Sequence, residues 1–315
     1  MWRFRLVPDG TRIQFMKGRI AGLVTSAVLS TLSIVLFIYP GLNYGIDFKG
    51  GIVMEIRTPG PADFGKLRSD LEALKLGAVG LQQFGSAQDV LIRLDRQPGD
   101  DSAQQVAVAK VRGTLAKDFP NTEVRRVDAV GATVSGELFR DGMTALSLAL
   151  VAMLIYIWFR FEWQFGVGAV ATLVLDMTKI VGLYALTQFQ FNLTGIVAIL
   201  TIMGYSINDK VVVYDRVREN LRLYKGLGLR ELIDLSINET LNRTIMTSMT
   251  VFLATLPLAL FAGEALRDFA IVLLLGIVIG TSSSIFIAAP ILLFLGQRAL
   301  RPGAPARTAA SEPAQ

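Results

Sequence analysis

The chain has no cysteine and no histidine among its 315 residues. Without cysteine there are no disulfide bonds, thiol nucleophiles, iron–sulfur clusters or cysteine-ligated zinc sites. Without histidine there is no imidazole acid–base chemistry, histidine zinc cluster or histidine-ligated haem. Charge is also scarce, since Asp, Glu, Lys and Arg make up 18% of the residues. Any proton chemistry therefore depends on carboxylates, lysine or tyrosine.

Apolar residues fill 52% of the positions, which is high for an ordinary soluble domain. A membrane-spanning helix needs about 20 mostly apolar residues, and six runs of this kind are present. The predicted spans are Ile20–Tyr39, Met143–Phe159, Phe165–Leu186, Leu193–Tyr214, Leu241–Ala262 and Phe269–Leu295. The first run could also be a signal peptide, but its full length and the lack of a small-residue cleavage site after it favour a span.

The basic residues predict the orientation of the spans. If residues 1–19 are cytoplasmic, the short inner segments carry fourteen Lys and Arg residues, whereas the short outer loops carry only Arg267. The positive-inside rule then places both termini in the cytoplasm. This distribution explains the net charge of +5 without nucleic acid. We expect disorder in residues 298–315, which are rich in Pro and Ala.

Residues 40–142 have a different composition and are expected to form a soluble domain on the outer side of the membrane. Alternating and helical patterns occur in the order strand, helix, strand, strand, helix, strand, which is that of a ferredoxin-like α+β unit. The expected elements cover residues 51–58, 61–76, 79–84, 90–94, 102–119 and 122–130. The predicted fold class is a polytopic α-helical membrane protein with six transmembrane helices. This domain is inserted between helices 1 and 2, and helices 2–6 form a bundle in residues 143–297.

Four sequence motifs stand in order within this layout. They are NYGIDFKGG at 43–51, VGATVSGELFRDG at 130–142, YSINDKVVVYDRVREN at 205–220 and NRTIMTS at 242–248. Together they resemble the SecF family of the bacterial Sec protein-translocation machinery, over about residues 15–297. The resemblance implies half of an RND-type unit of twelve helices, completed by SecD.

The resemblance also implies a function, partners and a place in the bacterial inner membrane, with the outer domain in the periplasm. It implies an auxiliary translocase subunit that uses the proton-motive force to help complete the export of unfolded preproteins, with neither enzymatic activity nor a cofactor. The implied partners are SecD, the SecYEG channel, YajC or YidC, SecA indirectly, the translocating polypeptide and membrane lipid, but no nucleic acid. An alternative is a self-contained RND-like exporter of small molecules or lipids, although a single insert of about 100 residues argues against it. A membrane hydrolase with paired aspartates is a third alternative.

Charged residues within spans are costly, at about 2.5–3.5 kcal/mol on insertion scales, and are functional candidates. Asp209 and Arg243 lie at comparable depths near the cytoplasmic ends of neighbouring spans. A cross-helix ion pair is therefore expected, and the resemblance assigns both positions to proton conduction. A static bridge between the helices is the alternative. Asn208 and Ser206 could orient Asp209 or hold water, or simply pack between helices.

Asp176 is a second candidate for the proton relay. It corresponds to an acidic position that the SecF family usually precedes with histidine, where this chain has Leu175. Lys179 lies three residues further on and could form a local ion pair with Asp176, so a relay role and a static pair both stay open. Lys210 is expected to extend toward the cytoplasm rather than to conduct protons. A hydrolytic pair is disfavoured because Asp176 and Asp209 lie at different predicted depths.

Two glycine patterns indicate structural roles, a turn and close helix packing, rather than a catalytic or phosphate-binding site. GIDFKGG lacks the phosphate-binding pattern GxxxxGK[ST] and is predicted to be a tight turn into the first strand, with Asp47 and Lys49 near the bilayer surface. Gly276 and Gly280, continued by Ser284, predict close helix packing, either within the chain or against SecD.

Overall fold

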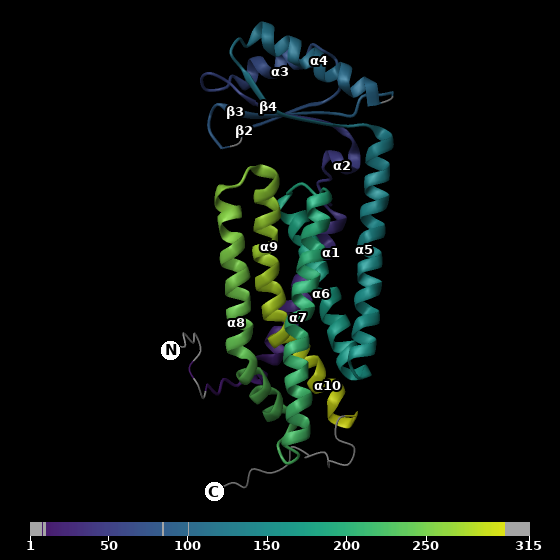
Figure 1. Ribbon diagram of the computed structural model, residues 1–315, viewed down its shortest axis with the longest axis vertical. Coiled ribbons are helices and arrows are strands. Elements are labelled where there is room, and N and C mark those ends of the chain that lie inside the picture. Colours follow the sequence, from purple (N-terminus) through teal and green to yellow (C-terminus); the bar gives the residue numbers. More distant parts are fainter. Residues whose placement is uncertain (1–7, 9–10, 84, 100, 300–315) are drawn as a thin grey trace.

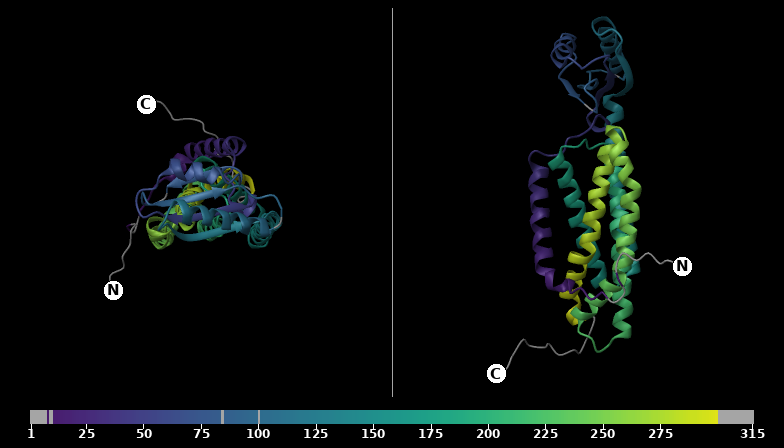
Figure 2. Two further views of the ribbon diagram at one scale, coloured as in Figure 1. Left: turned by 90° about the horizontal axis from the view of Figure 1, so that it is seen from above. Right: turned by 90° about the vertical axis from the view of Figure 1, so that its left-hand side faces the viewer.

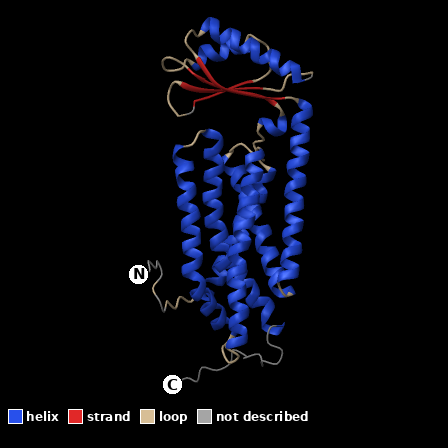
Figure 3. Cartoon of the chain, viewed as in Figure 1, coloured by secondary structure: helices blue, strands red, loops and turns tan. Residues whose placement is uncertain are grey.

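The computed structural model describes residue 8 and residues 11–83, 85–99 and 101–299. A bundle of long helices carries one small α+β domain at one end (Figures 1 and 3). Within these described residues, six helices are long and apolar enough to cross a membrane. The predicted six spans and single inserted domain are therefore confirmed, whereas the disorder expected of the tail falls almost entirely outside the described residues.

The bundle has inner and outer helices. Its helices are α1 (Arg19–Ile38), α5 (Ala132–Arg160), α6 (Trp163–Thr187), α7 (Leu193–Leu223), α8 (Leu229–Phe261), α9 (Glu264–Ser283) and α10 (Ala289–Ala299). A π-helical turn, η2 (Ser284–Ala288), joins α9 to α10. In α6, α7 and the α9–α10 segment, 50–61% of the residues in an 18-residue apolar stretch are buried within the chain. The corresponding share in α1, α5 and α8 is 11–17%. Figure 2 shows α1 at the outside of the bundle.

Helix α8 begins twelve residues before the predicted span, at Leu229 rather than Leu241. In this extension Leu232 and Ile237 are buried against the bundle. The short 3-10 turn η1 (Phe15–Gly18) packs there too, and the Met16 N–H donates to Asp234 Oδ1 at 2.8 Å. The extension therefore packs on its own bundle and on the chain that leads into α1.

The outer domain has the predicted order of elements. They are β1 (Gly51–Arg57), α3 (Phe64–Glu72), β2 (Val79–Gln83), β3 (Asp89–Leu94), α4 (Asp101–Asp118) and β4 (Glu123–Val130). The strands form an antiparallel sheet in the order β2-β3-β1-β4. Apolar side chains of alternating residues, such as Ile52 and Met54, form a core with α3 and α4 on one face. The other face, which includes Val53 and Glu55, is turned toward the bundle (Figure 1).

A one-turn helix, α2 (Ile46–Lys49), stands where a tight turn was expected. The backbone N–H of Leu193, the first residue of α7, donates to Asp47 Oδ2 at 3.0 Å. Asp47 therefore caps α7, a role that the expected position near the bilayer surface did not suggest. Gly50 and Gly51 then adopt φ angles of +74° and +129°, which lead the chain into β1.

Four aromatic rings pack around α2 and are here called the aromatic joint. They belong to Tyr44, Phe48, Phe139 on α5, and Phe191, two residues before α7. Their centroids lie 5.4–6.4 Å apart in mostly edge-to-face pairs. The aromatic joint thus fixes the base of the outer domain to the outer ends of two bundle helices.

The geometry at Gly51 generates a prediction. A Cβ atom on residue 51 would lie 2.7 Å from the Leu94 carbonyl oxygen. The φ angle of Gly51 is also unfavourable for any residue with an L side chain. Gly51→Ala should therefore destabilise the outer domain by about 1–3 kcal/mol. The measurement is hydrogen exchange of the sheet amides in the full chain. Gly60→Ala is the control, because no atom lies within 4 Å of its Cβ position; equal effects of the two changes would contradict the argument.

An ion pair between the half-buried Arg57 and the buried Asp89 lies at the end of the sheet. Arg57 Nε and Nη2 each donate to one carboxylate oxygen of Asp89 at 2.7 Å, and Ser86 Oγ donates to the same carboxylate. Arg125 approaches Asp89 Oδ1 at 3.3 Å. The hydrogen bonds from Arg57 outweigh the desolvation of Asp89 and hold the pKa of that carboxyl well below its usual range.

This depressed pKa makes the outer domain sensitive to acid. The pair contributes stability above the unfolded pKa of Asp89, near 4, and that contribution is lost as the pH falls toward the folded pKa. Asp89→Asn should therefore weaken the sheet at neutral pH, and the difference from the parent chain should shrink in acid. Comparing sheet-amide exchange of the two chains at each pH tests this; a difference independent of pH would contradict it.

Candidate functional site

Two carboxylates are buried among the inner helices. Asp176 on α6 has an exposed fraction of 0%, and Asp209 on α7 one of 6%. A carboxylate in such an apolar region is tolerated only where donors or counter-ions surround it. The partners of these two groups therefore define the candidate site.

Asp209 joins three helical segments. Thr244 Oγ1 on α8 donates to Asp209 Oδ1 at 2.7 Å, and Ser284 Oγ, the first residue of η2, donates to Oδ2 at 2.5 Å. Both carboxylate oxygens are thus satisfied by neutral hydroxyl groups. The site can hold a charged carboxylate without a directly bound cation.

Asp176 lies at the centre of a denser network. Its Oδ2 accepts hydrogen bonds from Ser206 Oγ at 2.8 Å, from Ser283 Oγ at 2.6 Å and from Lys210 Nζ at 2.9 Å. The ammonium of Lys179 lies 3.5 Å from Oδ1, so the predicted local pair with Asp176 is confirmed. One carboxylate and two ammonium groups therefore share this part of the bundle.

The expectation that Lys210 extends toward the cytoplasm is wrong. Its side chain has an exposed fraction of 1%. The ammonium donates to the Ser206 carbonyl at 3.2 Å and also bonds the Ser206 hydroxyl, one turn earlier on α7. Helical side chains point back toward the N-terminus, which brings Lys210 to Asp176. Leaving a buried carboxylate without this cation would be strongly destabilising.

Arg243 is exposed on α8, and within the described ranges of the chain no ion pair joins it to Asp209. The expected cross-helix pair is thus not met, because the next residue, Thr244, faces Asp209 instead. Arg243 is still near enough to act on Asp209 electrostatically. Asn208 is exposed on α7, and Ser206 contacts Asp176 rather than Asp209.

Two consecutive serines at the junction of α9 and η2 bond the two carboxylates, Ser283 donating to Asp176 and Ser284 to Asp209. π-Helical turns are rare and often mark functional sites. Sequence reasoning missed Ser283 and Thr244 as ligands of the carboxylates and treated Ser284 only as a packing residue. The available signal was the run TSSS at 281–284 inside an apolar span.

Glycines allow this approach of α9 to α7. Side-chain atoms of Ile202 occupy the space that a Cβ of Gly276 would need, and Ser206 Cβ lies 3.3 Å from the Cβ position of Gly280. The two glycines therefore pack within the chain, which was one of the two predicted possibilities. Close packing here brings Ser206 beside the end of α9.

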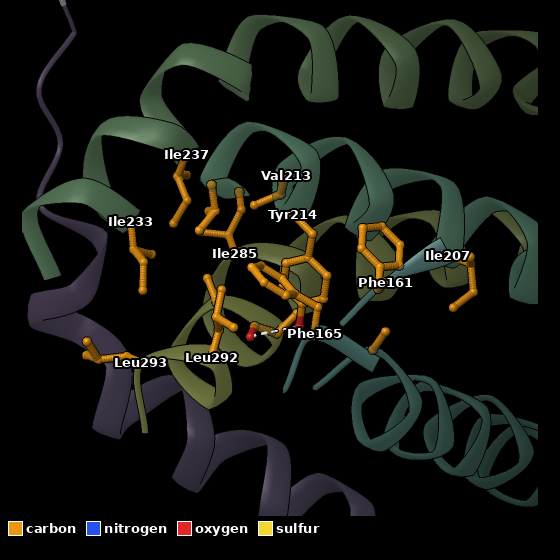
Figure 4. Close-up of a cluster of buried hydrophobic side chains, with 14 of the residues drawn as sticks. Phe161, Phe165, Ile207, Val213, Tyr214, Ile233, Ile237, Ile285, Leu292 and Leu293 are labelled. Atoms are coloured by element: carbon orange, nitrogen blue, oxygen red, sulfur yellow. Dashed lines mark hydrogen bonds between the residues drawn. The ribbon is translucent and has the colours of Figure 1, made fainter. Parts of the chain in front are cut away.

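An aromatic core adjoins η2 (Figure 4). Tyr214 packs against Phe161 and Phe165, with ring centroids 6.0 and 5.3 Å apart. Its hydroxyl donates to the Ala288 carbonyl at 3.0 Å, the dashed line in Figure 4. This bond satisfies a carbonyl at the end of the π-helical turn inside an apolar cluster that also includes Ile285.

The site is suited to binding and releasing protons. Carboxylates, hydroxyls and lysines can exchange or orient protons in a protected space. Among the residues that the structure describes, no group of three or more His, Cys, Asp or Glu side chains could hold a metal ion.

The buried position of Lys210 generates a prediction. Lys210→Met should destabilise the bundle by about 3–5 kcal/mol, because it leaves Asp176 without its closest cation. The double change with Asp176→Asn should recover most of this loss, since no isolated charge then remains. Thermal unfolding in detergent measures both. Lys179→Met is the matched control with a smaller expected effect, since its ammonium is further from Asp176; failure of the double change to recover stability would contradict the assignment.

Family models match most of the chain. The model described as protein export membrane protein SecD/SecF, C-terminal, matches residues 110–298, and the SecD/SecF GG motif matches residues 35–58. A curated relative named protein translocase subunit SecF from Rickettsia bellii is 44% identical over 95% of this chain and 98% of its own length. Protein translocase subunit SecDF from Brucella abortus is 42% identical over 93% of this chain, which spans 38% of that longer protein.

Solved structures give the same result. The crystal structure of SecDF from Thermus thermophilus superposes with a TM-score of 0.82 at 33% identity, covering 95% of this chain and 40% of that one. A SecDF structure in a super-membrane-facing form matches over the same shares with a TM-score of 0.68. The family models, the near full-length SecF relative and the shared architecture together establish that this chain belongs to the SecD/SecF family of protein-export membrane proteins.

Proposed function

We propose that this chain is a SecF-type auxiliary subunit of the Sec protein translocase, which couples proton flow to the export of unfolded preproteins. The observation that carries the proposal is Asp209, a carboxylate buried in the bundle between hydroxyl donors of two neighbouring segments. The translocase names of the relatives support the same role. The proposed location is the bacterial inner membrane, with the sheet domain in the periplasm and both termini in the cytoplasm.

Protonation of Asp209 would change the direction of the hydrogen bonds with its neighbours. As a carboxylate it only accepts, so Thr244 and Ser284 can both donate to it. As a carboxylic acid it carries one O–H donor, and one of the two hydroxyls must turn to accept. The hydrogen bond from Asp209 to α8 or to η2 then reverses its direction. Protonation can thereby favour one of two helix packings over the other.

The membrane potential supplies energy on a suitable scale. One charge that crosses 100 mV contributes about 2.3 kcal/mol. That amount can bias two packings that differ by a few hydrogen bonds, because one such bond contributes about 1 kcal/mol net. Several protons would therefore accompany the export of one long polypeptide.

Helix α7 provides a direct connection from the site to the outer domain. It carries Asp209 within the bundle, and its first N–H is capped by Asp47, four residues before β1. The aromatic joint holds the same region against α5. A shift of α7 is thereby passed to the base of the sheet without a flexible linker.

The remaining polar groups have proposed roles in the same cycle. Asp176, with Lys210 and Lys179, is proposed as a second relay group that senses the protonation of Asp209 through Ser283 and Ser284.

Exposed polar residues on α7 and α8 are proposed to contact partner proteins. The exposed Arg243 and Asn208 are proposed to face SecD, which supplies the other half of a twelve-helix unit. The longer SecDF relatives, of which this chain spans about two fifths, support SecD as the partner. Contacts with SecYEG, with YajC or YidC, and indirectly with SecA are proposed from the same role.

Asp209→Asn tests the function. The amide keeps the shape of the side chain and can still accept from one hydroxyl, but it cannot take up and release a proton. Membrane insertion and copurification with SecD should be retained, while the proton-dependent part of secretion is abolished. The measurement is preprotein export into inverted vesicles, with and without a proton-motive force.

Asp141→Asn is the control, because this exposed carboxylate lies beside Gly142, which packs on Leu193 and Ile196 at the outer end of α7, more than three helical turns from Asp209. It should leave export unchanged. Full proton-driven export by the Asp209 variant would overturn the relay role. A chain that never copurifies with SecD, and transports a small solute alone, would favour an independent exporter.

A further inference from the structure

The chain that leads into α1 crosses the end of the bundle opposite the outer domain (Figure 1). The main-chain N–H of Ile13 donates to Asn238 Oδ1 at 3.0 Å, and Asn238 Nδ2 donates back to the Ile13 carbonyl at 2.8 Å. The Met16 N–H donates to Asp234 Oδ1 at 2.8 Å. Asp234 and Asn238 lie about one turn apart near the beginning of α8. The main chain of this segment is therefore tied to the base of α8.

The same segment packs on the π-helical turn η2. The rings of Phe15 and Phe286 meet edge to face, with their centroids 6.1 Å apart. Met16 is fully buried in the apolar cluster that includes Ile285 of η2 (Figure 4). The turn η1, which contains Phe15 and Met16, contacts both α8 and η2. We call Ile13, Phe15 and Met16 the N-terminal clamp, because they join the base of α8 to η2.

The start of α1 adds to the contact with η2. A Cβ atom on Gly22 would lie 2.8 Å from the Phe286 carbonyl oxygen and 2.9 Å from the Phe286 Cβ. Only a residue without a side chain allows α1 to come this close to η2. The turn η2 is therefore held on this side by the N-terminal clamp and by the helix that follows it.

The two segments that the N-terminal clamp joins are the ones that donate to Asp209. Thr244 follows Asp234 on the same continuous helix, about 15 Å further along at 1.5 Å per residue. Ser284 is the first residue of η2, two residues before Phe286. A shift of the base of α8 moves Thr244, and a shift of η2 moves Ser284. Both hydroxyl groups therefore reach Asp209 only while α8 and η2 keep their relative positions.

We propose that the N-terminal clamp positions Thr244 and Ser284 around Asp209. This inference rests on the proposed function, because it gives the N-terminal clamp a role in the response of Asp209 to protons. When one hydrogen bond of Asp209 reverses on protonation, the N-terminal clamp limits how far α8 and η2 move apart. Its members are positioning residues that act through these two segments. The cations near Asp209, which are Lys210 and Arg243, lie outside the N-terminal clamp.

Substitutions at both ends of the N-terminal clamp test the proposal in the complex with SecD. Asp234→Ala removes the acceptor of the Met16 N–H, whereas Asp234→Asn keeps an acceptor oxygen and removes only the charge near Arg230. Phe15→Ala removes the ring contact with η2. Gln14→Ala changes an exposed side chain beside the N-terminal clamp and is the matched control. Two disrupting changes are used so that misfolding of one leaves the other informative.

Infrared difference spectra between neutral and acidic pH report on Asp209 itself. Its protonated carboxyl group gives a C=O stretching band, which is identified by its loss in Asp209→Asn. A carboxyl C=O that loses a hydrogen-bond donor absorbs at a higher frequency. We expect Asp234→Ala and Phe15→Ala each to move the band to higher frequency and to lower proton-driven export several-fold, with export in the absence of a proton-motive force unchanged. Asp234→Asn and Gln14→Ala should keep the band and the export of the parent chain.

An unmoved band in Asp234→Ala or Phe15→Ala chains that copurify with SecD would overturn the proposal. A segment that only anchors the N-terminus would change the stability of the bundle but not the hydrogen bonds of Asp209. An equal shift of the band in Gln14→Ala would also overturn it. If Asp209→Asn abolishes proton-driven export while the disrupting variants match the parent chain, the proposed function stands and the positioning role is wrong. If Asp209→Asn keeps full proton-driven export, the proposed function fails and this inference fails with it.

Discussion

The structure depends on the cost of placing ionisable groups in an apolar bundle. Asp176 and Asp209 can lie there only because each is surrounded by donors from neighbouring helices. That requirement accounts for the hydroxyl residues on α7, α8 and the end of α9. It also accounts for Gly280, since the donors of α9 reach the carboxylates only where that helix comes close to α7. The close packing of α9 on α7 and the hydrogen bonding of the two carboxylates therefore both follow from the need to satisfy buried charges.

The two carboxylates are held in different ways. Asp176 has a cation within hydrogen-bond distance, whereas Asp209 has only neutral hydroxyls. A hydroxyl group can donate to a carboxylate or accept from a carboxylic acid, whereas an ammonium group can only donate. Lys210 and Asp209 are adjacent on α7, so one turn of this helix supplies both the cation that bonds Asp176 and the carboxylate that is bonded by hydroxyls.

Much of the fold was predictable because its signals are local. Each span is a run of apolar residues, and the strands of the outer domain alternate over a few positions, so neither needs knowledge of distant contacts. The pairing of side chains across helices was not predictable in the same way. Arg243 and Thr244 differ by one residue, a rotation of about 100° around the helix, and boundaries known only within a few residues cannot decide which of them faces Asp209.

Two further errors have related causes. The direction of Lys210 depends on Asp176 being beside it on α6, a contact between residues 34 positions apart. The roles of Ser283 and Ser284 depend on a π-helical turn, which shifts the face that a helix presents and has no reliable sequence pattern. In the outer domain, the resemblance located the double glycine, but only backbone geometry shows that Gly51 needs its positive φ.

Helix α5 has a consequence for the membrane itself. It is 29 residues long, begins two residues after β4 ends, and has 11% of its apolar window buried (Figure 1). The faces of α5 that its own chain leaves exposed are open to lipid or to a partner helix, and a helix that faces lipid adjusts its tilt to the thickness of the hydrocarbon layer. Because α5 continues almost directly from the sheet, hydrophobic mismatch would be converted into a change in the height and angle of the outer domain. Whatever packs on the exposed faces of α5 would therefore act on the position of the outer domain.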